Sequence, residues 1–190
     1  MRSFAKIKIS LSTPICLAAF TVIYGTRYIF SILAAVILHE LGHIAAIYLL
    51  NGEISEITLR PFGAVIKKSE SNTSYFADFI TALAGPLVNI ISFLVCLSIG
   101  VMGTFAYSSI ILALVNLIPA KPLDGYCATR SVSLCFFSLT VSENICRIIS
   151  VITLTLIWIF TVYMIIFTEF NLSLLIMTTF LICETVISRK

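Results

Sequence analysis

Charged residues are scarce in this 190-residue chain. Twelve basic and nine acidic residues make up 11% of it, against about 25% in a typical soluble domain. The basic residues form no run and no patch interleaved with aromatic residues, and the net charge is +3, which excludes a nucleic-acid-binding protein. With 59% hydrophobic residues, the chain has more apolar surface than a soluble core of this length can bury. We therefore expect a polytopic membrane protein rather than a soluble enzyme.

Polar linkers and internal repeats are also absent. The sequence instead divides into six apolar runs, and a helix needs about 20 such residues to cross a membrane. The runs cover residues 11–26, 28–50, 78–102, 105–118, 146–167 and 170–187. We expect an all-α fold of about six transmembrane helices that form one domain over residues 1–190. The first run follows basic residues, as a secretory signal does, but it lacks a convincing small-residue cleavage site, which favours a retained span.

The basic residues favour one orientation of these spans. With the N-terminus in the cytoplasm and six crossings, every basic residue except Arg27 lies on the cytoplasmic side. This predicts a multi-pass protein of the cell membrane with both termini in the cytoplasm. The prediction requires residues 125–145 to stay cytoplasmic or interfacial, because the ends reverse if the apolar stretch 133–139 crosses.

The segment between the second and third runs breaks the helical pattern. Residues 54–66 contain two short β-prone pieces that are interrupted by Pro61-Phe62-Gly63. We expect a short β-hairpin-like segment that lies against the membrane or the helix bundle. The alternative is a plain surface loop.

Only two histidines occur in the chain, His39 and His43, and they lie four positions apart inside a predicted span. On an α-helix this spacing places both imidazoles on one face, where both can bind one zinc ion. Glu40 follows the first histidine, where it can activate a water molecule. The alternative is a pair of buried histidines bonded to neighbouring helices. Because a carboxylate inside a membrane is costly and the H-E-x-x-H pattern is complete, we favour the metal site.

A hydrolytic zinc site usually has three protein ligands, so a third must come from elsewhere in the chain. There is no third histidine, and the other acidic residues lie at or beyond span ends or, like Glu184, near enough to reach the interface, which leaves Asp124. Asp124 closes the predicted fourth span, where two prolines end the helix and Gly125 permits a tight turn. An Asp-Gly pair alone is also typical of a simple turn.

Polar and small residues in the third span lie at the depth of the histidines. His43 and His39 are 7 and 11 residues inside the second span, which is roughly 10–16 Å from its cytoplasmic end. Gly85 and Asn89 lie 7 and 11 residues from Asp78, at the same end of the third span. We expect them to form one wall of the site. The alternative is a helix kink with an interhelical hydrogen bond.

Three motifs in this order resemble those of the site-2 proteases, the intramembrane zinc metalloproteases: H-E-L-G-H, A-G-P-L-V-N and N-L-I-P-A-K-P-L-D-G. The segment L-R-P-F-G-A-V is similar to that of the compact bacterial branch related to stage IV sporulation protein FB. The resemblance implies that His39, His43 and Asp124 bind one Zn²⁺ per chain. It also implies that Glu40 is the catalytic acid/base.

The resemblance further implies a membrane-anchored or membrane-spanning protein substrate, cut near the cytoplasmic side in regulated intramembrane proteolysis. It admits a regulatory partner in the membrane. Asn89 and Asn116 match motif positions that would contact the substrate or the metal ligands. The chain departs from the family where its D-G motif continues with Tyr126 and Cys127 instead of Gly-Arg, and where Ala64 replaces a common glycine. We expect no PDZ domain and no CBS domain.

A membrane transporter and a non-catalytic metal-binding membrane protein are the competing interpretations. A transporter predicts ionisable groups along a path through several spans, often in repeated halves, whereas here the polar groups share one depth. The presence of Glu40 argues against a protein that only binds metal. Metal analysis combined with a cleavage assay separates the three.

Overall fold

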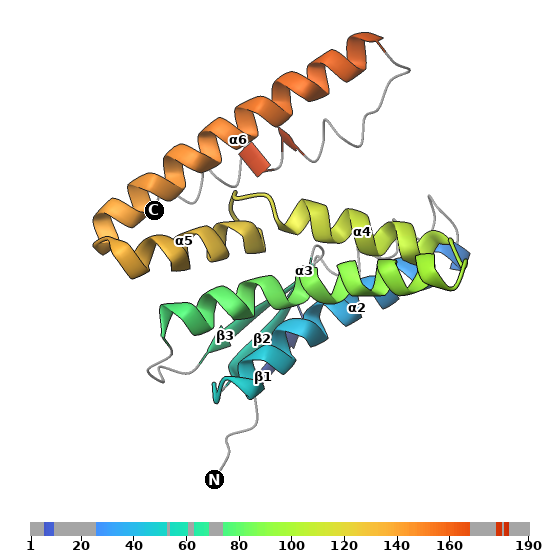
Figure 1. The fold of residues 1–190 in the computed structure, drawn as a ribbon, viewed down its shortest axis with the longest axis horizontal. Helices are drawn as coiled ribbons and strands as arrows, with labels where there is room; N and C mark the ends of the chain where they lie inside the picture. Colours follow the sequence, from blue (N-terminus) through green and yellow to red (C-terminus); the bar gives the residue numbers. More distant parts are fainter. Residues whose placement is uncertain are drawn as a thin grey trace. The chain divides into compact units, whose positions relative to one another are not determined.

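The computed structural model describes residues 6–9, 26–52, 54–60, 63–68, 74–167, 178–179 and 181–182. Helices dominate this part of the chain, and one small sheet accompanies them (Figure 1). In chain order the elements are β1 (Lys6–Ile9), α2 (Thr26–Leu49), β2 (Ile54–Arg60), β3 (Gly63–Lys68), α3 (Tyr75–Ser98), α4 (Thr104–Asn116), α5 (Asp124–Phe136) and α6 (Leu139–Phe167).

Three of the described helices are long and apolar enough to cross a membrane. They comprise Tyr28–Leu49 of α2, α3 and α6, and they match three of the six predicted runs. α4 covers the predicted fourth span, but its 13 residues make about 20 Å of helix, less than the ~30 Å of a bilayer's hydrocarbon core. Most of the first and last runs lies outside the described residues. A mostly helical protein with membrane-length helices is confirmed, and the count of six spans stays a prediction.

Local sequence sets the ends of α2 and α3. After α2, Asn51 has a positive φ of 57°, and the amide of Gly52 donates to the carbonyl of Ile47 at 2.8 Å, which closes the last turn of the helix. The Ser74 hydroxyl caps the start of α3 by accepting a backbone N–H of the first turn at 3.2 Å. Gly100, with a φ of 72°, follows the end of α3. Local contacts therefore define the end of α2 and both ends of α3.

α2 and α3 approach each other closely where α2 has a glycine. A Cβ atom at Gly42 would lie 2.8 Å from the carbonyl oxygen of Ala84 and 3.0 Å from Cγ2 of Val88, both on α3. Small residues permit this approach between membrane helices because they let the backbones come together. The buried residues of α2 around this contact are Ala35, His39, Gly42, His43, Ala46 and Ile47. The packing of the two helices thus encloses both histidines.

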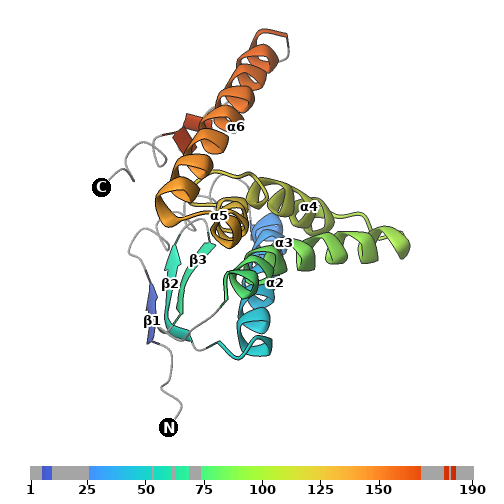
Figure 2. The same ribbon diagram turned by 60° about the vertical axis from the view of Figure 1, so that its left-hand side comes forward.

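The three strands form one sheet in the order β1-β2-β3 (Figure 2). β2 and β3 pair antiparallel, with Arg60 opposite Gly63. β1 pairs with β2 in parallel, with Lys6 opposite Glu56. The sequence predicted extended structure over residues 54–66, and the two residues between β2 and β3 lie outside the described part. The sequence did not predict β1, because the partner of this strand lies far along the chain. By sequence, residues 6–9 are only part of the basic segment before the first apolar run.

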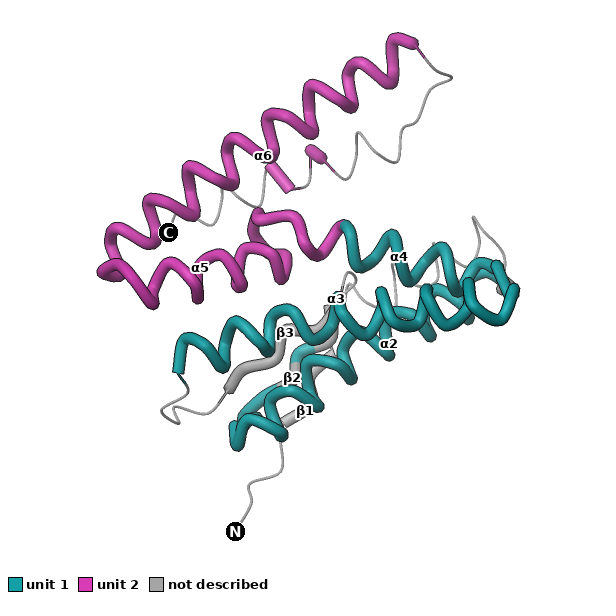
Figure 3. The backbone as a smooth tube through the Cα atoms, in the orientation of Figure 1, with its two compact units in different colours: residues 1–114 teal, residues 115–190 magenta. Residues whose placement is uncertain are grey.

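The chain divides into two compact units, residues 1–114 and 115–190 (Figure 3). In the second unit, α5 and α6 pack against each other, and Ala120, Leu154 and Leu181 form a buried apolar cluster. The connection between α4 and α5 is tied to α6 by Ser150, whose hydroxyl lies 2.7 Å from the carbonyl oxygen of Pro119. This hydrogen bond fixes the proline-containing connection that precedes Asp124.

Candidate metal centre

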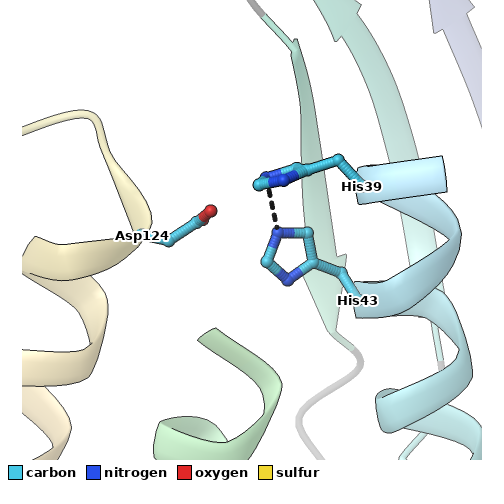
Figure 4. Close-up of side chains that lie close together, drawn as sticks. All are labelled: His39, His43 and Asp124. Atoms are coloured by element: carbon cyan, nitrogen blue, oxygen red, sulfur yellow. Dashed lines mark hydrogen bonds between the residues drawn. The ribbon is translucent and has the colours of Figure 1, made fainter. Parts of the chain in front are cut away.

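The two histidines lie on the buried face of α2, where His39 is 4% exposed and His43 is 8% exposed. Their Nε2 atoms are 3.2 Å apart, as the dashed line in Figure 4 marks. Two nitrogens that each lie about 2.0–2.1 Å from one tetrahedral zinc ion are about 3.3 Å from each other. The prediction that the imidazoles share one helix face is confirmed, and their separation fits one shared metal ion.

α3 supplies a partner to the other nitrogen of each ring. Nδ1 of His43 lies 2.8 Å from the carbonyl oxygen of Thr81, and Nδ1 of His39 lies 3.3 Å from Nδ2 of Asn89, which is fully buried. Such partners fix the orientation and the tautomer of metal-binding histidines. Sequence analysis found Asn89 by its depth in the span. It missed Thr81, because the contact uses a backbone carbonyl that any residue type provides.

Gly85 lies between these two partners on the same face of α3. A Cβ atom at this position would overlap Nε2 of His43 and would lie 2.9 Å from Nε2 of His39. Gly85 lies inside a helix and has no positive φ, so backbone conformation does not explain why a glycine is present here. The missing side chain keeps open the space beside both Nε2 atoms. Gly85 and Asn89 therefore do line the histidine pair, as their depth predicted.

Glu40 follows His39 on α2 and is partly exposed, unlike the two imidazoles. Neighbouring residues of an α-helix are rotated by about 100° around the axis, so the side chain of Glu40 leaves the helix beside that of His39 and not in line with it.

Asp124 is the first residue of α5 and is partly buried. The partial positive charge of a helix N-terminus stabilises a carboxylate at this position. The prediction that Asp124 closes the fourth span in an Asp-Gly turn was wrong, because α4 ends at Asn116 and the turn lies before Asp124. Asn116 is partly buried at the end of α4, and the helix stops before Pro119, as the prolines predicted.

Gly125 brings the first turn of α5 against the preceding connection. A Cβ atom at Gly125 would overlap the carbonyl oxygen of Leu117 and would lie 2.6 Å from that of Ile118. The glycine lies inside the helix, so it serves close packing and not the tight turn that the sequence suggested. Its contact with the connection fixes where the neighbouring Asp124 begins the helix.

Comparisons with known proteins agree with the family resemblance, and the matched family model covers the first two of the three motifs. Residues 27–105 match the model of peptidase family M50. The chain is 34% identical over 126 residues to a protein of Synechocystis that is named as a zinc metalloprotease, which covers 57% of this chain and 33% of that relative. It is 31% identical over 103 residues to stage IV sporulation protein FB of Bacillus subtilis, which covers 50% of this chain and 36% of that relative. The chain thus matches about a third of the length of these curated relatives.

A solved structure shows the same fold. The site-2 protease from Methanocaldococcus jannaschii matches with a TM-score of 0.70 and 21% sequence identity, over 100% of this chain and 95% of that one. At this identity the likeness establishes the fold alone. The family match over residues 27–105 and the two curated relatives confirm the resemblance to the site-2 proteases.

Proposed function

We propose that the protein is an intramembrane zinc metalloprotease that hydrolyses peptide bonds of membrane-anchored or membrane-spanning proteins. The observation that carries this proposal is the histidine pair, buried in a helix of membrane-spanning length, with Nε2 atoms 3.2 Å apart. The two curated relatives, one named as a zinc metalloprotease and the other as stage IV sporulation protein FB, support it.

His39, His43 and Asp124 are the proposed zinc ligands. This assignment is supported by the two histidine Nε2 atoms, which lie 3.2 Å apart, and by the D-G motif in which the family resemblance places the third ligand. Two imidazoles and one carboxylate are a donor set typical of hydrolytic zinc sites, and three protein ligands leave a fourth position open. The residues therefore fit one Zn²⁺ per chain.

The proposed mechanism assigns the proton transfers to Glu40. Zinc, when bound, would polarise the scissile carbonyl and lower the pKa of a water molecule at the open position. The Glu40 carboxylate takes the proton of the attacking water and then delivers it to the leaving amine. The carbonyl of Thr81 holds the ring of His43 through Nδ1, which keeps Nε2 directed at the site. Gly85 keeps the space beside both Nε2 atoms free of side-chain atoms.

A helical substrate hides its peptide bonds, so it must be extended before it can be cut. We propose that an extended substrate segment adds to an edge of the small sheet. Among the described strands β2 is paired on both sides, which leaves the outer edges of β1 and β3 for this role.

The membrane arrangement is part of the same proposal. We propose a multi-pass protein of the cell membrane with six spans and both termini in the cytoplasm. In this proposal β2 and β3 form a hairpin, and cleavage takes place near the cytoplasmic side. The distribution of basic residues, all but Arg27 on one side, supports this orientation. A regulatory partner in the membrane stays a prediction of the family resemblance.

Zinc content and cleavage of a co-expressed single-span substrate test the function together. Wild-type protein should hold about one zinc per chain and cut the substrate. Glu40→Gln keeps the size of the side chain but cannot take the proton, so it should bind zinc normally while cleavage falls by about 10²–10⁴-fold. His43→Ala should lose both zinc and cleavage, and Asp124→Asn should lose zinc because an amide is a poorer ligand than a carboxylate.

Two results would contradict the proposal. A Glu40→Gln variant that cleaves at the wild-type rate excludes the mechanism, whatever its zinc content. If wild type and Glu40→Gln both bind zinc and neither cuts the substrate, the protein is a transporter or a metal-binding protein. Normal zinc content and activity in Asp124→Asn would return Asp124 to the role of a helix-start residue.

A further inference from the structure

The two histidines differ in the partner that faces Nδ1. The partner of His43 is the carbonyl oxygen of Thr81 at 2.8 Å, and a carbonyl oxygen can only accept. Nδ1 of His43 therefore carries the single proton of the neutral ring. Nε2 of the same ring therefore carries a lone pair, which faces Nε2 of His39 at 3.2 Å, and this unprotonated nitrogen is the form that binds a metal ion.

His39 faces the opposite kind of partner. Its Nδ1 lies 3.3 Å from the amide nitrogen Nδ2 of Asn89, and an amide nitrogen only donates. In this orientation Nδ1 of His39 accepts, so the proton of the neutral ring lies on Nε2. A protonated Nε2 has no lone pair to offer a metal ion. The two imidazoles therefore become equivalent ligands only if Asn89 faces Nδ1 of His39 with a hydrogen-bond acceptor instead of a donor.

Asn89 can make that change without losing another hydrogen bond. Its side chain is fully buried, and its oxygen Oδ1 has no hydrogen-bond partner in the described part of the chain. A half-turn of the terminal amide exchanges Oδ1 and Nδ2 and places an acceptor opposite Nδ1. Both orientations leave one atom of the Asn89 amide without a partner in the described part of the chain, so neither is favoured by the surroundings of Asn89 alone. The tautomer of His39 decides the orientation, because an amide N–H cannot face a protonated Nδ1.

We propose that Asn89 is a positioning residue whose amide turns so that Oδ1 accepts the Nδ1–H of His39, which leaves Nε2 of His39 free to bind zinc. The inference rests on the proposed function, because it concerns the metal-binding form of the site. Asn89 then does for His39 what the Thr81 carbonyl does for His43. The ring changes tautomer in this step: it loses the Nε2 proton and takes up one on Nδ1 by exchange with water, so it carries one proton before and after.

Nitrogen NMR of the full chain with ¹⁵N-labelled histidine tests the proposal, because the chain contains only two histidines. In zinc-loaded wild type, both rings should carry the proton on Nδ1, and both Nε2 signals should show the shift caused by the metal. Asn89→Leu has a similar volume but no acceptor. It should weaken zinc binding by about 10–100-fold and move the Nδ1–H signal of His39, while that of His43 stays in place as the internal control.

Asn89→Asp is the matched variant, because a carboxylate can accept but has no N–H to donate. It should keep the Nδ1–H signal of His39. Its zinc affinity should stay within about threefold of wild type, a much smaller change than the loss of an outer hydrogen-bond partner causes. If Asn89 instead acts as a donor, Asn89→Asp should lose as much zinc affinity as Asn89→Leu, which would overturn the proposal.

Two further outcomes also overturn it. One is wild-type zinc affinity in Asn89→Leu, with an unchanged His39 signal. The other is a zinc-loaded wild type in which Nδ1 of His39 carries no proton, a result that needs no variant to fold. Failure of the proposed function is recognised separately, since neither Nε2 signal of the wild type would then respond to zinc, and the inference would fall with it.

Discussion

The histidine region and the aspartate region of the candidate metal centre are built in different ways. His39 and His43 lie in the middle of α2, and contacts from α3 hold both rings through Nδ1. Asp124 lies at the first residue of α5, and the chain before it is held by backbone packing and by one hydrogen bond from α6. Each region has a glycine where a Cβ would collide, but the colliding atoms differ. They are histidine ring nitrogens at Gly85 and backbone carbonyls at Gly125.

This difference predicts two kinds of damage. A methyl group at Gly85 collides with the atoms that would bind the metal, so metal binding should suffer first. A methyl group at Gly125 collides with backbone that positions Asp124, so folding stability should suffer first. The following substitutions test the comparison, from the largest expected effect to the smallest.

Gly85→Ala should remove most of the bound zinc and abolish cleavage, because its methyl group would overlap Nε2 of His43 and crowd Nε2 of His39. Alanine favours a helix over glycine, so α3 itself should not be weakened. Zinc per chain, measured on purified protein, checks the prediction. Gly103→Ala is the matched control, since a Cβ there meets nothing within 4 Å. Full zinc content in Gly85→Ala would show that the histidine region tolerates a side chain at this place.

Gly125→Ala should lower the free energy of unfolding by about 1–3 kcal/mol, the usual range for overpacking, because the backbone of residues 117 and 118 must move. Zinc affinity should fall less than in Asp124→Asn, since the carboxylate is retained. Thermal unfolding and zinc competition on the same samples separate the two effects, again with Gly103→Ala as control. If Gly125→Ala loses its zinc but unfolds like wild type, the contrast between the two regions is wrong.

Ser150→Ala should have the smallest effect. It removes the hydroxyl whose single proton is shared between the carbonyls of Pro119 and Cys146, and should cost about 1 kcal/mol of stability, with zinc binding near normal. Thr155→Ala, at an exposed position of the same helix, should stay within about 0.5 kcal/mol of wild type. Equal unfolding of the two variants would indicate that the hydrogen bond does not hold the connection.

The histidine region was readable from sequence because its chemistry follows helical periodicity. A spacing of four residues puts His39 and His43 on one face of any α-helix, and the count of residues from the span ends brought Gly85 and Asn89 to the same depth. What periodicity could not supply is the partner of His43. That partner is a backbone carbonyl, which every residue has, so only the packing of α2 against α3 identifies Thr81.

The aspartate region was readable only in part. The prolines predicted the end of α4, but the sequence assigned Asp124 and Gly125 to a turn, whereas both lie in the first turn of α5. Asp-Gly is typical of turns and is also compatible with a helix start, so local propensity alone does not decide between them. The strand β1 was missed for a related reason, because its pairing with β2 depends on a contact between distant parts of the chain.

By itself, the sequence determined the membrane class, the membrane-length helices α2, α3 and α6, and the histidine pair on one helix face. These features depend on composition and on periodicity, which act within a single element. Only the tertiary structure decided which atoms face Nδ1 of each histidine, why glycine is required at positions 85 and 125, and that a third strand joins the sheet. Those features depend on how closely two backbones approach, and the sequence of one helix or strand alone does not determine that distance.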